Sequence, residues 1–200
     1  GGYRPSADPA SHRLVTIYTG DPGTGKTDRA LTGPDPIAYF DIDRGSEGVI
    51  EKAVAAGKDI TVVPIEWGIE NTQVEYKRIW DDFADRVDMV CKALRGSGGT
   101  IIFDTYTELV ELAEWAFVGK VSEIPPNKHK VYQAPLRGIV RTVMGIPDLN
   151  AVFIHKWGPV FQGPGSEIKG YKDMQYQVQA VIQLHMDGKG NRRQTFQKCR

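Results

Sequence analysis

Apolar positions along the chain recur with two different periods, and each period predicts one kind of element. From residue 76 to residue 94 the apolar residues recur at steps of three and four, as on one face of a helix. They are Tyr76, Trp80, Phe83, Val87, Val90 and Leu94. Shorter apolar and β-branched runs predict strands at residues 14–19, 37–43, 60–65, 100–105 and 151–155. We expect the helical stripe to be core and to carry no chemistry.

The segments between these strands predict further helices and a hairpin at the end of the chain. Helices are expected at residues 28–31, 47–56, 108–117 and 136–144, and a hairpin of residues 178–186 and 194–198 across a glycine-rich turn. Residues 119–134 and 156–175 are read as loops because they are rich in proline or glycine and lack periodicity. The order predicts an α/β fold with a mostly parallel central sheet, flanked by helices and ending in a β-hairpin.

Length and composition are those of one globular domain. The chain has 200 residues, 40% of them hydrophobic, and a net charge of zero, so affinity for nucleic acid would have to come from local clusters of cations. Residues 1–12 are expected to be a flexible lead-in and residues 13–200 a single domain. The two cysteines lie far apart in sequence, which is typical of a reducing compartment. The longest apolar runs are too short to span a bilayer, and the expected location is the cytoplasm.

One glycine-rich stretch points to phosphate chemistry. Residues 20–27 read GDPGTGKT, which fits G-x-x-x-x-G-K-[ST], and they stand between a predicted strand and a predicted helix, as a P-loop requires. Glycines let successive backbone N–H groups point into one anion site. Lys26 is expected to reach the β- and γ-phosphates and Thr27 to ligate Mg²⁺. The predicted nucleotide contacts are Asp21, Pro22, Gly23, Thr24, Gly25, Lys26, Thr27 and Asp28. The alternative is a glycine-rich turn before an ordinary helix.

Three further polar residues fall at carboxyl ends of predicted strands, where ligands of parallel sheets bind. Asp104 ends an apolar strand and is a candidate to hold Mg²⁺, or else caps the next helix. Asp43 is a candidate to activate water, with Asp41 as its rival because residues i and i+2 share a face. His155 is a candidate γ-phosphate sensor, although a lone histidine at a strand end is often structural.

The order of these motifs resembles the RecA-like ATPases, in particular small phage-type members implicated in single-strand annealing and recombination. The resemblance rests on GDPGTGKT, YFDID, TIIFD, AVFIHK, the long glycine-rich segment and the terminal QKCR, and it covers roughly residues 13–200. It implies a RecA-like P-loop core that uses ATP and Mg²⁺. It also implies that Asp43 is the catalytic carboxylate, where the family commonly has glutamate, and that His155 is the polar residue after the fifth strand.

The same resemblance implies two kinds of partner. Residues 119–134 and 156–175 match the family's two loops for single-stranded DNA. Both carry cations, and the second also carries aromatic side chains; the candidate contacts are Lys128, Lys130, Lys156, Trp157, Lys169 and Lys172. From the residues alone, two solvated surface loops are an equal alternative. Lys198 and Arg200 match cations that reach the nucleotide of the neighbouring subunit, which implies a homo-oligomeric ring or filament.

The leading hypothesis is therefore an oligomeric, Mg²⁺- and ATP-dependent, single-stranded-DNA-binding ATPase of recombination or strand annealing. A single-strand DNA-binding protein is a further candidate partner, a membrane is not, and a phage-encoded protein would act in the host cytoplasm. A second hypothesis is a nucleotide-gated assembly or binding module with slow hydrolysis and no DNA role. A third is a small-molecule kinase, which also uses a P-loop.

Overall fold

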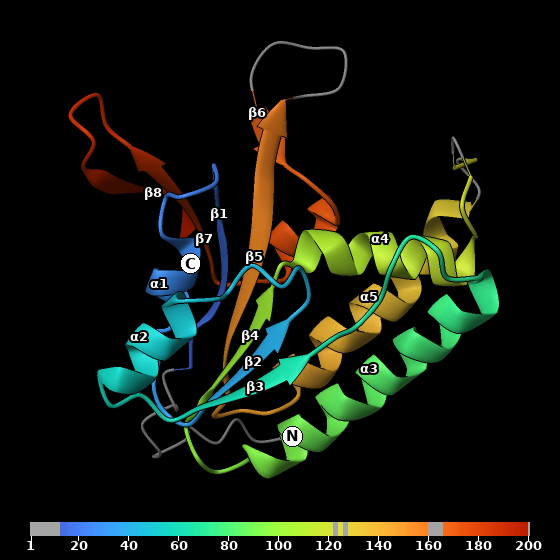
Figure 1. Cartoon of the computed structure of the whole chain (residues 1–200), viewed down its shortest axis with the longest axis horizontal. Helices are drawn as coiled ribbons and strands as arrows, with labels where there is room; N and C mark the ends of the chain where they lie inside the picture. Colours follow the sequence, from blue (N-terminus) through green and yellow to red (C-terminus); the bar gives the residue numbers. More distant parts are fainter. Residues whose placement is uncertain (1–12, 122–123, 126–127, 160–165, 200) are drawn as a thin grey trace, which may run out of the picture.

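The protein is built on a twisted central sheet (Figure 1). The computed structural model describes residues 13–121, 124–125, 128–159 and 166–199. Within these residues the sheet has eight strands in the order β3-β2-β4-β5-β1-β7-β8, with β6 paired to β5. The strands are β1 (Val15–Gly20), β2 (Ile37–Asp41), β3 (Ile60–Pro64), β4 (Thr100–Asp104), β5 (Asn150–Pro159), β6 (Ser166–Ile168), β7 (Ala180–Met186) and β8 (Arg192–Cys199).

Strand directions match the predicted sheet. Neighbouring strands from β3 to β7 run parallel, while β8 is antiparallel to β7 and β6 is antiparallel to β5. The mostly parallel sheet with a C-terminal hairpin is thus confirmed. Strand β5 lies between β1 and β4. The carboxyl ends of these three strands therefore lie side by side, which brings the P-loop after β1 near the acid that ends β4.

Helices cover both faces of the sheet (Figure 1). On one face the apolar side chains of the sheet pack with α1 (Lys26–Ala30) and α2 (Val49–Ala55). On the other face they pack with α3 (Gln73–Ala93), α4 (Tyr106–Phe117) and α5 (His129–Met144). The stripe predicted from residue 76 to residue 94 is buried at Tyr76, Trp80, Phe83, Val87 and Leu94, and partly buried at Val90.

An aromatic row crosses three adjacent strands and anchors this second face. Phe103 of β4 stacks on Phe40 of β2 and on Phe153 of β5, with ring centroids 5.1 Å apart in each pair. All three side chains have no exposed surface. Such pairs add about 0.5–1.5 kcal/mol beyond their burial. The stacked rings therefore hold β2, β4 and β5 in fixed positions relative to one another, and the candidate acids follow or end two of these strands.

Two segments predicted as loops contain regular structure. Helix α5 begins at His129 rather than at residue 136, and Pro135 lies inside it. A proline normally ends a helix, but buried Tyr132, Leu136 and Ile139 give this segment a continuous apolar face, and that tertiary packing prevails. In the second segment, β5 runs on to Pro159 and pairs with β6, and a short 3₁₀ helix (Lys172–Tyr176) follows. The loop predictions for residues 129–134 and for much of 156–175 were therefore wrong.

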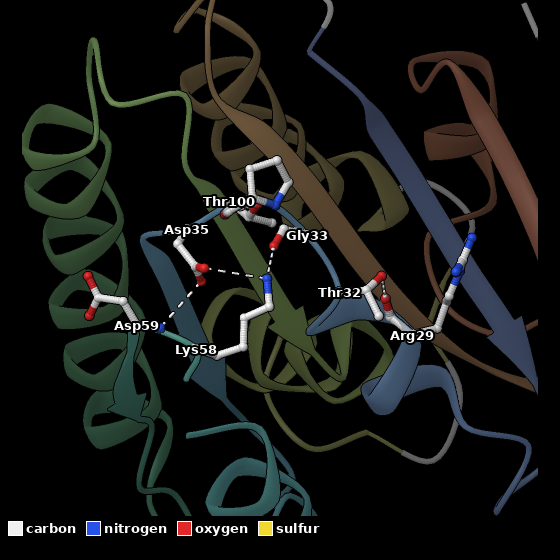
Figure 2. A network of polar contacts seen from close by, with 8 residues as sticks. Arg29, Thr32, Gly33, Asp35, Lys58, Asp59 and Thr100 are labelled. Atoms are coloured by element: carbon white, nitrogen blue, oxygen red, sulfur yellow. Dashed lines mark hydrogen bonds and ion pairs between the residues drawn. The ribbon is translucent and has the colours of Figure 1, made fainter. Parts of the chain in front are cut away.

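A polar network at the amino ends of the strands fixes the return from α1 to β2 (Figure 2). Lys58 Nζ donates to the carbonyl of Gly33 at 2.7 Å and lies 3.5 Å from Asp35 Oδ2. Thr100 Oγ1 donates to the carbonyl of Pro34 at 2.8 Å. This network lies at the amino ends of the strands, whereas the P-loop follows the carboxyl end of β1. Among the described helices, none has the length and apolarity needed to cross a membrane.

Candidate functional site

The backbone of the P-loop has the conformation that its glycines predict. Gly23 and Gly25 have φ angles of 76° and 87°, a region that favours glycine. Gly20 ends β1 with a φ of 142°, and a Cβ there would collide with the backbone carbonyl of Leu184 in β7. Inside the loop, Thr24 is 2% exposed and its hydroxyl donates to the carbonyl of Asp21 at 2.8 Å. Close strand contact and tight turns thus account for the glycines.

Lys26 lies folded back over this loop. Its Nζ donates to the carbonyls of Gly20 at 2.9 Å and Asp21 at 2.8 Å. Burial lowers the pKa of Lys26, and nearby Asp104 opposes that shift. The ammonium is therefore partly removed from water, and in the described structure its hydrogen bonds go to neutral carbonyls, with the carboxylates of Asp104, Asp21 and Asp43 nearby. A phosphate group would give it a much stronger partner than either carbonyl.

Asp104 is almost completely buried next to the loop. It is 4% exposed, and its Oδ2 accepts hydrogen bonds from Thr27 Oγ1 at 2.6 Å and from Tyr39 Oη at 2.7 Å. Burial raises the pKa of this carboxyl group, and the two hydroxyl donors counteract that rise. Burial and the neighbouring Asp104 also raise the pKa of Tyr39, so its hydroxyl remains a donor. The structure thus brings Thr27 and Asp104 together, and it adds Tyr39, which the sequence presented only as a core residue of a strand.

Asp43 and Asp41 have different surroundings. Asp43 lines a cavity of about 340 Å³ together with Gly20, Pro22, Lys26, Thr27, Gly45, Asp104, Thr105, Lys156 and Trp157. Asp41 instead accepts a hydrogen bond from Ser46 Oγ at 2.8 Å, and its Oδ1 is buried. Of the two rival acids, Asp43 is therefore the one that shares a cavity with the P-loop lysine. Its Oδ1 also accepts from the backbone N–H of Gly45 at 3.0 Å, which orients the carboxylate.

His155 lies near these residues in the sheet but on the other face. Its side chain has no exposed surface, its ring lies 5.3 Å from that of Tyr106 in α4, and its Nδ1 is 3.0 Å from the carbonyl of Lys169. Because a carbonyl only accepts, Nδ1 carries the proton, and Nε2 has no partner among the described residues. Burial lowers the pKa of His155 to about 4, so the ring is neutral near pH 7. Within the described chain, His155 does not line the cavity of Lys26.

The predicted DNA-contacting residues lie in two separate places (Figure 1). Lys128 and Lys130 are exposed at the start of α5, at the far end of the helical layer. Lys156 forms an ion pair with Glu108 beside the P-loop cavity, which Trp157 also lines. Lys169 donates to the carbonyl of Pro159 and lies 3.8 Å from Glu167. The backbone of Lys172 lies in the 3₁₀ helix, and its side chain is outside the described part of the structure.

Of the two predicted terminal cations, Lys198 is described and Arg200 lies outside the described residues. Lys198 Nζ donates to the carbonyls of Gln175 and Val178, the latter at 2.9 Å. A different cation of the same hairpin reaches the P-loop. Arg192 Nη1 donates to Asp28 Oδ2 at 2.6 Å. The sequence did not single out Arg192, because no local signal distinguishes it from the other cations near the chain end.

The residues at the cavity fit a magnesium–triphosphate group. The described residues contain no cluster of three or more histidine, cysteine, aspartate or glutamate side chains that could cage a metal by themselves. Mg²⁺ in phosphoryl-transfer sites is instead held by one or two protein oxygens together with phosphate oxygens and water. Thr27 and Asp104 would supply such oxygens, and Lys26 would supply the cation for the phosphates. What the triphosphate–Mg²⁺ group supplies when bound is a reactive γ-phosphoryl whose charge the metal neutralises.

Fold and loop together define a RecA-like P-loop core. Among solved structures, the RadB recombinase is similar: its crystal structure aligns with a TM-score of 0.56 at 14% sequence identity, over 94% of this chain and 81% of that one. Neither a known protein-family model nor a curated protein sequence matches the chain. The structural similarity at this low identity establishes the RecA-like fold.

Proposed function

We propose that this protein is a Mg²⁺-dependent ATPase. The observation that supports it most directly is the hydrogen bond of 2.6 Å between Thr27 and Asp104, which joins the P-loop to the acid at the end of β4 inside one cavity. Lys26 binds the β- and γ-phosphates, and Thr27 and Asp104 hold the metal. Asp43, which lines the same cavity, orients or deprotonates the attacking water. The RecA-like fold, which the chain shares with the RadB recombinase, is consistent with this proposal.

The test pairs Lys26→Ala with Lys77→Ala. In the described structure Lys26 donates hydrogen bonds to carbonyls of its own loop, so its loss should leave the fold intact but weaken ATP binding at least a hundred-fold and abolish turnover. Lys77 lies on α3 and forms an ion pair with Asp81 one turn along the same helix, so its loss should lower stability slightly and leave ATP affinity unchanged. Calorimetry and a phosphate-release assay measure both. Unchanged ATP affinity in Lys26→Ala would refute the P-loop assignment.

We further propose that the ATPase acts as an oligomer on single-stranded DNA, in recombination or strand annealing of the phage type, in the cytoplasm. The exposed Lys128 and Lys130 and the placement of Trp157 at the nucleotide cavity support a DNA role, since stacking on an aromatic beside the γ-phosphate would couple the two ligands. Fluorescence anisotropy with a labelled oligonucleotide, with and without an ATP analogue, tests this. Nucleotide binding without any DNA affinity at low salt would exclude this DNA role.

In this proposal Arg200, and Lys198 once released from the carbonyls of Gln175 and Val178, reach the nucleotide of the neighbouring subunit. Lys198→Ala/Arg200→Ala should bind ATP as a monomer but lose assembly and turnover, because a cation supplied in trans stabilises the transition state by roughly 10³–10⁵ in rate. Mixing this variant with Lys26→Ala should restore some activity, since a mixed interface pairs an intact P-loop with intact cations. If mixed oligomers form but no activity is recovered, the proposal that two subunits share one active site is contradicted.

A second candidate function is a nucleotide-gated assembly module with slow hydrolysis and no DNA role. One observation favours it: Lys156 and Lys169, two of the predicted DNA-contacting cations, are already paired with Glu108 and Glu167 of the same chain. ATP-dependent assembly in the absence of DNA affinity would select this alternative.

A further inference from the structure

Arg192 packs directly on the P-loop of its own chain. It is the first residue of β8, and its Nη1 lies 2.6 Å from Oδ2 of Asp28 in α1. Its guanidinium also covers Gly25: a Cβ placed on that glycine would be 2.9 Å from Cζ and from Nη1. The hairpin β7–β8 is therefore in contact with the loop at the turn where α1 begins. Both side chains keep solvent access, with exposed fractions of 56% for Arg192 and 33% for Asp28.

Two neighbouring cavities meet at this ion pair. One, of about 320 Å³, lies between α1 and the hairpin and is lined by Gly25, Arg29 and Leu184, among others. The other, of about 450 Å³, lies between α1 and α2 and is lined by Leu31, Val49, Lys52, Ala53, Ala56 and Lys58, among others. Asp28, Thr32 and Arg192 line both. The Arg192–Asp28 pair thus lies where the two cavities join, in one groove whose walls are partly apolar and carry several cations.

This groove and the cavity that contains Asp43 and Asp104 are lined by different residues of the P-loop segment. Lys26 and Thr27, which serve the β- and γ-phosphates and the metal, line the cavity with Asp43 and Asp104. Asp28 follows them in the chain and lines the groove instead. The backbone N–H groups of a P-loop bind the α- and β-phosphates. Because Arg192 lies over Gly25 of that loop, the α-phosphate is expected beside Asp28 and Arg192.

We propose that Arg192 binds the α-phosphate of the nucleotide held by its own subunit, and that Asp28 positions the guanidinium for that contact; this rests on the nucleotide-binding function proposed above. A guanidinium has five donors in a planar fork, so one can remain on Asp28 while others meet phosphate oxygens. A surface ion pair of this exposure adds little to stability, so a purely structural role accounts poorly for an arginine laid over Gly25. The hairpin thereby becomes part of the nucleotide site.

Because the α-phosphate is common to di- and triphosphates, the proposal predicts equal losses for both. In calorimetry, Arg192→Ala should weaken ADP and a non-hydrolysable ATP analogue by the same factor, about ten-fold or more. Arg192→Lys should recover part of the loss because it keeps the charge without the fork. Lys189→Ala removes a cation from the turn of the same hairpin, away from both cavities, and should leave both affinities unchanged. Thermal unfolding of each variant checks that the fold is retained.

The remaining outcomes separate the proposed role of Arg192 from the ATPase function on which it rests. Wild-type protein that binds neither nucleotide would refute the ATPase function itself. Wild-type binding with unchanged or tighter affinity in Arg192→Ala would overturn the role of Arg192 alone, tighter binding indicating that the arginine shields the site. A loss restricted to the ATP analogue would place Arg192 at the γ-phosphate and would also overturn the α-phosphate assignment.

Discussion

Tyr39 Oη donates a hydrogen bond of 2.7 Å to Oδ2 of Asp104, the same oxygen that accepts from Thr27. Tyr39 comes from β2 and Asp104 ends the adjacent strand β4. Two donors on one oxygen fix the orientation of the carboxylate and favour its ionised form. Tyr39 therefore acts through Asp104, as a positioning residue for the carboxylate that we propose holds the metal.

Tyr39→Phe removes this donor and keeps the ring in the core. We expect the Mg²⁺ concentration needed for half-maximal hydrolysis to rise about ten-fold or more, because loss of a hydrogen-bond partner of a ligating carboxylate typically costs about 10–100-fold in metal affinity. Turnover at saturating Mg²⁺ should change much less. Hydrolysis rates measured across a Mg²⁺ titration separate the two parameters.

The same variant should also shift the pH profile. The tyrosine hydroxyl lowers the pKa of Asp104, so its removal moves the loss of activity on the acidic side to higher pH. Tyr76→Phe is a matched control, since that hydroxyl donates to the carbonyl of Gly68 at 2.7 Å, far along the chain from the P-loop. Identical Mg²⁺ titrations for Tyr39→Phe and wild type would show that the hydroxyl has no positioning role.

The parts of the fold that were predictable are those that local sequence determines. The P-loop and the strand ending in Asp104 combine a glycine pattern or an apolar run with a polar residue at a fixed place, and both fit the structure. The stripe of α3 is periodic over five turns and is likewise buried. Because parallel strands place their carboxyl ends at one edge, the sequence also predicted that these residues would gather.

Contacts between distant segments were not predictable. The Arg192–Asp28 pair joins residues 164 positions apart, and the Tyr39–Asp104 bond depends on which strands are neighbours. The strand β6 is three residues long, too short for an alternating pattern to be recognised. Pro135 argued against a helix in this segment, but α5 forms there because burial of its apolar face stabilises it more than helix propensity opposes it.

Asp43→Asn and Asp41→Asn distinguish the two acids of the YFDID segment. Asp43 lines the cavity with Lys26, so its amide variant should keep nucleotide affinity and lose roughly 10²–10⁴ in turnover, because only water activation is removed. Asparagine at position 41 can still accept from Ser46, so that variant should lose less than about ten-fold. Single-turnover hydrolysis measures both. The reverse ranking would mean that the catalytic carboxylate lies two residues earlier.

His155 should make stability depend on pH. Its pKa falls from 6.5 to about 4 on folding, because burial disfavours the charged ring. Between these values the unfolded chain binds a proton that the folded chain does not. The free energy of unfolding should therefore fall as the pH drops through this window, by roughly 3 kcal/mol at most, and this contribution should be constant above pH 7.

Urea unfolding at a series of pH values from 4 to 8 measures this effect. His155→Gln removes the titrating group, so its stability should fall less steeply than that of wild type between about pH 6.5 and pH 4. Other groups, including Asp104, titrate in both proteins and cancel in the comparison. His185→Gln, at a partly buried position of β7, controls for the loss of a histidine as such. Parallel stability curves for wild type and His155→Gln would contradict the buried neutral ring.

The DNA proposal predicts a specific salt dependence. Lys128 and Lys130 are both exposed at the start of α5, and each phosphate neutralised on a single strand contributes about 0.7 to the slope of log affinity against log salt. Lys128→Ala/Lys130→Ala should therefore make the slope shallower by about 1.4. Trp157→Ala should instead weaken binding at every salt concentration with little change in slope, since stacking on a base contributes roughly 1–3 kcal/mol without displacing ions.

Anisotropy titrations from low to moderate salt, with an ATP analogue present, measure both effects. The matched control is Lys92→Ala/Arg95→Ala, which removes two exposed cations from the opposite end of the helical layer and should change neither slope nor affinity. An equal change of slope in the control would mean that binding follows overall charge rather than the segment before α5. Trp157 pairs with Ile168 in the β5–β6 hairpin and lines the nucleotide cavity. If Lys128→Ala/Lys130→Ala leaves the slope unchanged while Trp157→Ala weakens DNA binding, the DNA contact is confined to that hairpin.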